Sequence, residues 1–216
     1  MPTLIRTAAP ADAPFLAWVM LTAARSHLAR GWFDIALDRP EADCLEFLRR
    51  LAVTHARSWW HFSRFHIAEV DGVAAAALCA FHGAEPYVAS SAAIDEVLAS
   101  EGAGKPESDA LWTRGSYIFS CTFEPHDAAW TIENIATLPR FRKRGLAGEL
   151  IRHVLPEGKR LGMREAQITF LIGNDPAERA YANAGFEHAG DHRSAAFEAA
   201  TGAPGIRRYV KPLRSD

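Results

Sequence analysis

The stretch from residue 130 to residue 155 constrains the fold most. An apolar, strand-like run, WTIENIATL, passes through the basic turn PRFRKR directly into an amphipathic segment that begins at Gly145. Apolar side chains then recur at helical spacing, at Leu146, Leu150, Ile151, Val154 and Leu155. A strand that leads straight into a helix is a building unit of α/β sheets, in which helices pack on the sheet.

The start of this expected helix is an expected anion site. The first N–H groups of a helix have no internal acceptor, and the helix dipole adds positive potential there. Gly145 and Ala147 let a ligand reach the backbone, and the cations of residues 142–144 supply the opposing charge. The strings GxxxxGK[ST] and GxGxxG do not occur in this part of the sequence. The sequence therefore predicts a phosphate or pyrophosphate ligand that is bound by neither of these two motifs.

The rest of the chain alternates between element types, which predicts a mixed α/β sheet covered by helices. We expect Asp38 to cap the second helix and Pro40 to open it, and Asp71-Gly72 to form a primed hairpin turn. The expected strands lie at 3–8, 65–70, 73–81, 116–123, 130–138 and 166–172, and near 186–190 and 206–212. The expected helices lie at 12–25, 38–52, 90–100, 145–155 and 176–184.

Composition narrows the class of protein. Of the 216 residues, 49% are hydrophobic, which is enough to bury a core. A formal net charge of -2 gives no general attraction to nucleic acid or to an anionic membrane. The three cysteines are odd in number and form no CxxC pair, which favours a reducing compartment over a disulfide framework or a zinc site. The sequence shows no signal peptide and no run of membrane-spanning length, so we expect a soluble, cytoplasmic protein.

A second motif follows the strand expected at 166–172. The segment GNDPAERAYANAGF places Asn174, Ala177, Tyr181 and the pair Gly185-Phe186 at fixed spacings. Together with IATLPRFRKRGLAGEL, it resembles the signature of the GNAT superfamily of acyl-CoA N-acyltransferases. In that family a strand ending near V-x-P leads into [Q/R]xxGx[G/A], and a later strand leads into NxxAxxxYxxxGF. The resemblance implies one domain over residues 1–216, with a mixed central β-sheet, helices on both faces, and splayed strands that form the acyl-CoA site.

The resemblance also implies how coenzyme A binds. The pyrophosphate would be held by backbone amides of residues 143–148, and the pantetheine arm would pair with the strand before them. Asn174 would hydrogen-bond that arm or the loop beside it. The implied acetyl-CoA-binding residues are Ile135, Ala136, Thr137, Arg142, Lys143, Arg144, Gly145, Leu146, Ala147, Gly148, Asn174 and Ala177. No metal is implied.

The chemistry of amine acylation adds two catalytic candidates. An amine must be neutral to attack a thioester, so a base near neutrality is needed, and Glu133 lies on the strand that would carry the thioester. The resemblance makes Tyr181 the general acid for the departing thiolate, because a phenol with a pKa of about 10 can match a thiol. A backbone N–H around residues 137–138 would stabilise the oxyanion. Asn134, next to Glu133, is expected to point to the opposite face of the strand.

The predicted function is transfer of an acyl group from acyl-CoA directly to an amine in a ternary complex. The expected acyl donor is acetyl-CoA. The alternative is a regulatory or interaction module of the same fold that binds acyl-CoA without turnover. The acceptor is a small-molecule or peptide amine of unspecified identity, and the oligomeric state stays open, a homodimer included. The net charge of -2 disfavours nucleic-acid binding by the basic turn. Cys121 and His126 could suggest an enzyme with an acyl-cysteine intermediate, but no further motif supports this alternative.

One segment lies outside the family's pattern, and two residues depart from it, of which Thr137 stands where a β-branched apolar residue is commoner. The segment of about 82–129 is an insertion candidate, and we expect it to shape the acceptor site, because long connections in compact domains are commonly functional. Pro156 falls within the helix that follows the basic turn, and we expect it to kink or end that helix.

Overall fold

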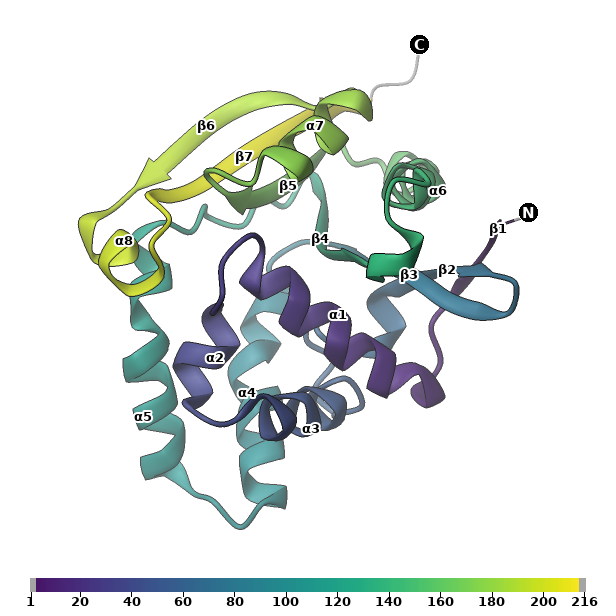
Figure 1. Cartoon of the computed structure of the whole chain (residues 1–216). Coiled ribbons are helices and arrows are strands. Elements are labelled where there is room, and N and C mark those ends of the chain that lie inside the picture. Colours follow the sequence, from purple (N-terminus) through teal and green to yellow (C-terminus); the bar gives the residue numbers. More distant parts are fainter. Residues whose placement is uncertain (1–2, 214–216) are drawn as a thin grey trace.

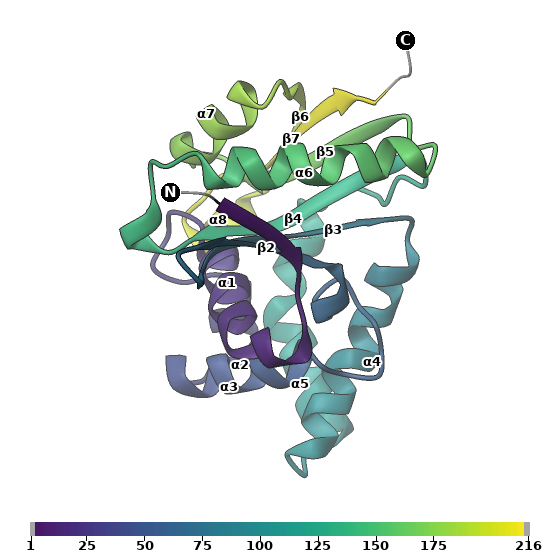
Figure 2. The ribbon, with the colours of Figure 1, turned by 90° about the vertical axis from the view of Figure 1, so that its right-hand side faces the viewer.

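The computed structural model describes residues 3–213, which form a mixed seven-stranded sheet with helices on both faces (Figures 1 and 2). The order across the sheet is β1-β2-β3-β4-β5-β7-β6. β4 and β5 pair in parallel, whereas the other neighbouring strands pair antiparallel. The strands are β1 (Thr3–Thr7), β2 (Phe65–Val70), β3 (Val73–His82), β4 (Ala129–Thr137), β5 (Glu165–Leu171), β6 (Glu187–Arg193) and β7 (Gly205–Pro212).

The helices divide between the two faces of the sheet. In Figure 2, α6 and α7 lie on one side of the strands, and α1 to α5 lie on the other. The helices are α1 (Ala13–Arg25), α2 (Trp32–Leu37), α3 (Glu41–Leu51), α4 (Glu85–Ser100), α5 (Lys105–Gly115), α6 (Leu146–Arg160), α7 (Asp175–Asn183) and α8 (Ala195–Thr201). None of the helices within residues 3–213 is long and apolar enough to cross a membrane.

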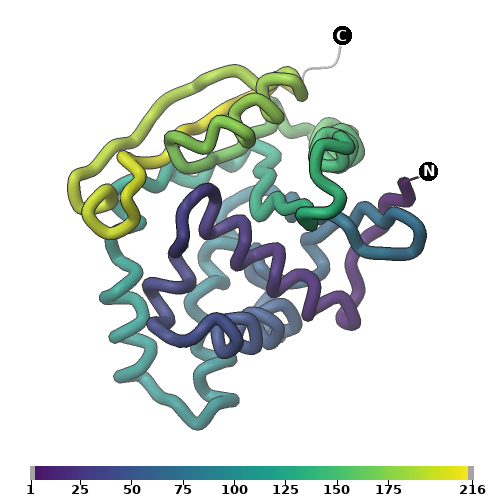
Figure 3. The backbone as a smooth tube through the Cα atoms, viewed as in Figure 1, coloured from purple at the N-terminus to yellow at the C-terminus, as the bar shows by residue number. Residues whose placement is uncertain are grey.

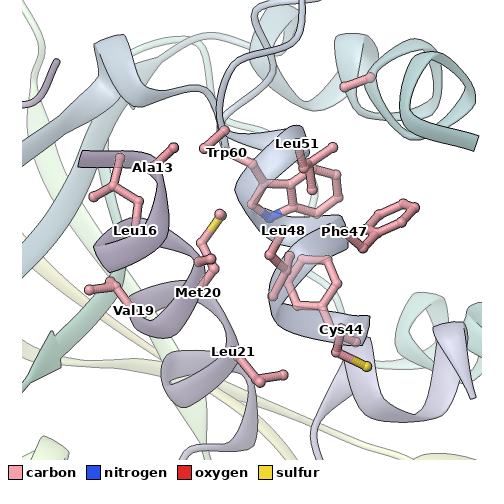
Figure 4. Packing of buried hydrophobic residues seen from close by; sticks show 14 of the residues in the cluster. Ala13, Leu16, Val19, Met20, Leu21, Cys44, Phe47, Leu48, Leu51 and Trp60 are labelled. Atoms are coloured by element: carbon pink, nitrogen blue, oxygen red, sulfur yellow. The ribbon is translucent and has the colours of Figure 1, made fainter. Parts of the chain in front are cut away.

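The larger core fills the space between the sheet and α1 to α5. α3 contributes a stripe of buried side chains at helical spacing, Cys44, Phe47, Leu48 and Leu51. Figure 4 shows α3 beside α1, with the Phe47 ring on the side of α3 away from Leu16 and Met20, and all of these residues belong to one buried cluster. Because β3 is covered on both faces, its sequence is apolar throughout rather than alternating. Its residues facing this core are Ala77, Cys79 and Phe81.

The second core lies between the sheet and α6. Helical spacing buries the apolar face of α6, made of Leu146, Leu150, Ile151 and Val154. At its far end Gly158 lies against the indole of Trp130, and a Cβ added at Gly158 would be 2.6 Å from Trp130 Cγ. Only a glycine fits this contact without movement of the tryptophan ring.

Three expectations about local structure are wrong. Asp38 has a φ of 52° and ends α2, a helix that the sequence analysis missed, so it does not cap the next helix. Pro40 precedes α3 as its N-cap, and the helix begins at Glu41. Residues 116–123 are not a strand: Ser116–Ser120 form a 3-10 turn, and the apolar side chains there pack around Cys121 instead of pairing along a strand.

Pro156 does not end α6, which continues to Arg160. A proline removes the hydrogen bond to the carbonyl four residues earlier, here that of Arg152. Both Arg152 and Pro156 are exposed, so water can bond that carbonyl and the helix is able to continue.

The segment of about 82–129 is largely helical. It contains α4 and α5, which Figure 3 shows in teal on the side of α1, α2 and α3, away from α6. Ile94, Leu98 and Leu111 are buried in the larger core. The segment is therefore part of the packed structure and not a loop laid over it.

Candidate active site

The parallel strands β4 and β5 separate halfway along their length. Their backbone register runs from Ala129↔Glu165 to Ile132↔Ile168 and ends there, although β4 continues to Thr137 and β5 to Leu171. On its other edge β4 stays paired with β3 to its end. The backbone of Ile135, Ala136 and Thr137 therefore borders a gap between strands, where an extended ligand could pair as an additional strand does.

Hydrogen-bond directions along β4 correct one expectation about the oxyanion donor. The Leu138 N–H donates to the Ala75 carbonyl of β3 at 2.8 Å, so it is not available to a ligand. Along an antiparallel strand these directions alternate, so the Thr137 N–H turns away from β3 towards the gap. Of the two expected donors, Thr137 has the required direction.

A β-bulge overturns the expected orientation of Asn134. The register between β3 and β4 shifts at this point, and Asn134 has a φ of 51°. Its Nδ2 donates to Cys79 Sγ at 3.6 Å, and Cys79 is the cross-strand partner of Glu133. Because the bulge adds a residue to β4, Asn134 lies on the face that Glu133 occupies, and strict alternation does not hold.

The basic turn leads into the first turn of α6, where the sequence predicts an anion site. Gly145 is the N-cap with a φ of 80°, and a Cβ there would meet no heavy atom of the described residues within 4 Å. The first intrahelical bond runs from the Glu149 N–H to the Gly145 carbonyl at 3.0 Å. The three amides before it, of residues 146–148, therefore have no acceptor within the helix. Lys143 also has a positive φ, of 62°, which curls the turn ahead of α6.

The arginines of the turn are exposed and take different directions. Arg142 Nε donates to the Thr137 carbonyl at 3.3 Å, which ties the turn to the end of β4. The guanidinium carbons of Arg140 and Arg144 lie 5.1 and 5.3 Å from the centroid of the Phe141 ring. Cation–π contact leaves the in-plane N–H groups of both guanidiniums able to bind an anion.

Glu133 lies at the point where β4 and β5 separate. Its Oε1 accepts a hydrogen bond from Thr169 Oγ1 of β5 at 2.7 Å. Burial raises the pKa of this carboxyl group to about 7, and the Thr169 hydrogen bond opposes that rise. A carboxylate with a pKa near neutrality is suited to exchange a proton at physiological pH.

Tyr181 lies on α7 with its ring packed edge-to-face on Phe170 of β5, at a centroid distance of 5.3 Å. Burial raises the pKa of the Tyr181 phenol above its ordinary value, and the charge of Glu133 adds to the rise. Tyr181 therefore keeps its proton over the physiological range, as a proton donor must.

Asn174 and Ala177 lie at the start of α7. Asn174 Oδ1 accepts from the Ala177 N–H at 3.2 Å and so caps the helix. Asn174 Nδ2 donates to Ser26 Oγ at 2.6 Å, beyond the end of α1. The structure thus places Asn174 between α7 and the loop after α1, and its hydrogen bond to a pantetheine arm stays a prediction.

Two residues linked to Glu133 were not among the sequence predictions. One is Thr169, which donates to Glu133. The other is Tyr87 of α4, whose pKa is raised by burial and then by the charge of Glu133. In β5 the polar residues Glu165, Gln167 and Thr169 alternate with apolar ones. This period-two pattern could have identified Thr169 from the sequence. Gln167 Nε2 donates to Thr131 Oγ1 at 2.9 Å, which makes a parallel link between the same two strands.

The model of the acetyltransferase (GNAT) family matches residues 30–186 of the chain. The chain belongs to this family. The expected GNAT fold, with its mixed sheet and helices on both faces, is confirmed, and the GNAT protein is an enzyme of the N-acetyltransferase class. No curated protein matches the GNAT chain by sequence.

Solved structures resemble this GNAT fold over nearly the whole chain. An acetyltransferase has a TM-score of 0.71 and 18% identity, covering 98% of this chain and 100% of its own. An N-acetyltransferase from Staphylococcus aureus Mu50 has a TM-score of 0.69 and 19% identity, covering 96% and 100%. The protein yncA from Salmonella typhimurium, solved with its cofactor acetyl-CoA, has a TM-score of 0.55 and 13% identity, covering 100% and 96%. Within residues 3–213 of the GNAT chain, no three His, Cys, Asp or Glu side chains group as metal ligands.

Proposed function

We propose that the protein binds acetyl-CoA between β4 and β5 and transfers the acetyl group directly to an amine in a ternary complex. One observation carries the proposal: Glu133, with a pKa raised to about 7, lies at the opening between the two strands and is held there by Thr169. The exposed amides at the start of α6 support pyrophosphate binding near the far end of β4. Family membership supports acetyl-CoA as the acyl donor.

In this mechanism two side chains each transfer one proton, and one backbone N–H stabilises the developing charge. Glu133 accepts the proton of the acceptor amine, directly or through a water molecule, as the nitrogen bonds to the acetyl carbonyl carbon. The Thr137 N–H donates to the carbonyl oxygen as negative charge develops there. The carbon–sulfur bond breaks, and Tyr181 gives its proton to the departing sulfur. The products are the N-acetylated amine and CoA with a free thiol.

Thiol release tests the proposal. Wild-type protein, acetyl-CoA and a broad panel of amines should give acceptor-dependent thiol release, without an acetylated protein intermediate in intact-protein mass spectra. Tyr181→Phe keeps the ring and its packing on Phe170 but removes the proton, so kcat should fall by about 10²–10⁴-fold with CoA affinity unchanged. Full activity of Tyr181→Phe would remove the acid role. Binding of acetyl-CoA without thiol release for any amine would favour a non-catalytic module.

A further inference from the structure

Another charged residue lies on the same face of the sheet as Glu133, two strands away. β5 separates β4 from β7, and Thr169 of β5 is the cross-strand partner of Arg208 of β7. Directly opposed residues of antiparallel strands point to the same face of a sheet. Because Thr169 also donates to Glu133, the three residues form a row across one face.

Arg208 differs from its neighbour Arg207 in how its charge is balanced. On the opposite face, Arg207 bonds Asp191 at 2.8 Å through Nε and Glu178 at 2.9 Å through Nη1. Within residues 3–213, Arg208 has no carboxylate at ion-pair distance, and its buried Nε has no hydrogen-bond acceptor. A half-buried cation without a counter-charge is costly in free energy, and an anionic ligand would remove that cost.

The Arg208 guanidinium is nevertheless held in place. Its carbon lies 4.7 Å from the centroid of the Phe123 ring. Phe123 stacks on His192 with ring centroids 3.8 Å apart, and His192 Nδ1 lies 3.1 Å from the Thr122 carbonyl oxygen. Stacking uses the face of a guanidinium and leaves its in-plane donors for an anion. Phe123 and Thr122 belong to the segment of about 82–129, which we expect to shape the acceptor site.

We propose that Arg208 binds a carboxylate of the acceptor, so that the acceptor is a small amine that also carries a carboxylate, such as an amino acid. The proposal rests on the proposed function, because the amine end must reach Glu133. Neighbouring strands lie about 4.8 Å apart, so the backbones of β4 and β7 are separated by roughly 10 Å, which two side chains and a small molecule can bridge. The guanidinium fork matches a carboxylate in a bidentate manner and repels the second ammonium group of a polyamine.

The first test compares acceptors with the wild-type protein. Several L-amino acids, the carboxamide of each, and spermidine are supplied with acetyl-CoA, and thiol release is followed. The carboxamide has a less basic and therefore more available amine, so preference for the free acid cannot come from amine reactivity. We expect kcat/KM to be about 10- to 100-fold higher for the acids, the range for a charge-assisted hydrogen bond. Faster turnover of carboxamides or of spermidine overturns the Arg208 proposal and leaves the proposed function intact, whereas no thiol release with any amine overturns both.

The second test uses variants. Arg208→Gln should raise KM for the preferred acid by about 10- to 100-fold, with the rate for its carboxamide and KM for acetyl-CoA unchanged. Tm should stay equal or rise, because the variant removes a half-buried charge that has no counter-charge. Arg208→Lys keeps the charge but lacks the planar guanidinium group, so its KM for the acid should lie between those of the wild type and Arg208→Gln. Arg193→Gln removes a cation from an exposed position on β6, where it bonds Asp191 at 3.2 Å, and controls for charge alone. Equal losses for acid and carboxamide, with a lower Tm, would show a structural role and overturn the proposal.

Discussion

The hydroxyl group of Thr169 limits how far burial raises the pKa of Glu133. It donates to the carboxyl group at 2.7 Å, which favours the ionised form, and the resulting pKa is about 7. Thr169→Val removes this donor at nearly constant volume, so the pKa of Glu133 should rise further. A hydrogen bond to a charged group corresponds to a shift of about one pH unit or more. We expect the acidic limb of the kcat/KM profile to move upward by that amount, with activity recovering at high pH.

The neighbourhood of Glu133 supplies the controls for this shift. Burial raises the pKa values of Tyr181, Tyr87 and Cys79, so these groups stay neutral in the range measured. Thr169→Ser keeps the donor and should retain the wild-type limb. Thr131→Val removes the parallel link to Gln167 and should lower stability without moving the limb. A Thr169→Val profile that overlays the wild-type profile would show that the hydroxyl does not influence the base.

The raised pKa of Glu133 also predicts how stability changes with pH. The folded-state pKa of Glu133, about 7, lies above the ordinary glutamate value of 4.5, so between these values the folded protein binds more protons than the unfolded chain. The contribution of Glu133 to the free energy of unfolding is therefore fully present below about pH 4.5 and is lost as the pH rises through about 7. Glu133→Gln cannot ionise, so it should gain stability relative to wild type by a quantity of the order of 3 kcal/mol between pH 5 and pH 8. Urea unfolding at both pH values measures this, and an unchanged difference would contradict the shift.

At the scale of elements, Gly145 is the position that shapes the start of α6. Its φ of 80° requires glycine, and the space in front of it is open. Gly145→Val would place a branched side chain where a pyrophosphate approaches, so CoA affinity should fall at least tenfold. Gly162, at the other end of α6, has a φ of 78° and equally open surroundings. Gly162→Val therefore carries the same backbone strain away from the ligand, and isothermal titration should show wild-type CoA affinity for it. Equal losses of CoA affinity in the two variants would contradict pyrophosphate binding at the start of α6.

Periodicity predicted α1, α3 and α6 and failed where the pattern is weak or the backbone geometry changes locally. It missed α5, because Leu111 and Trp112 are the only large apolar side chains among the eleven residues of this helix. The spacing of Cys44, Leu45, Leu48 and Leu51 predicts α3. Alternation would have predicted the orientation of Asn134 had β4 lacked a bulge. A bulge adds one residue to a strand, and no periodic pattern marks that addition. The short helices α2 and α8 were missed because six or seven residues give less than two turns of pattern.

At the scale of the whole molecule, the residues of the candidate site come from four elements: the strands β4 and β5, the start of α6, and α7. Tyr181 and the start of α6 were proposed from motif spacing and Glu133 from its place on the expected strand, because each lies within one contiguous segment. Alternation along β5 could have singled out Thr169, but not its hydrogen-bond partner, and no local pattern singles out Arg208. The contacts of both residues depend on the register between β4, β5 and β7, and β5 and β7 are far apart in the sequence. Strand order and register are set by packing over both cores, which local patterns do not encode.

The packing of the whole molecule also changes how the insertion should be tested. α4 and α5 bury Ile94, Leu98 and Leu111 in the larger core, so removing them would expose that core. Shortening the segment of about 82–129 would therefore confound acceptor effects with loss of the fold. Substitutions at surface positions, or at Tyr87 near Glu133, test the acceptor role while keeping both helices.

The most direct test of the account is a crystal structure of the protein with CoA. It should show the pyrophosphate on the backbone amides at the start of α6 and the pantetheine arm along residues 135–137, between β4 and β5. The sulfur should lie within hydrogen-bonding distance of the Tyr181 hydroxyl, on the side of the gap where Glu133 and Thr169 meet. CoA bound elsewhere, or bound with its sulfur turned away from both Tyr181 and Glu133, would contradict the proposed site.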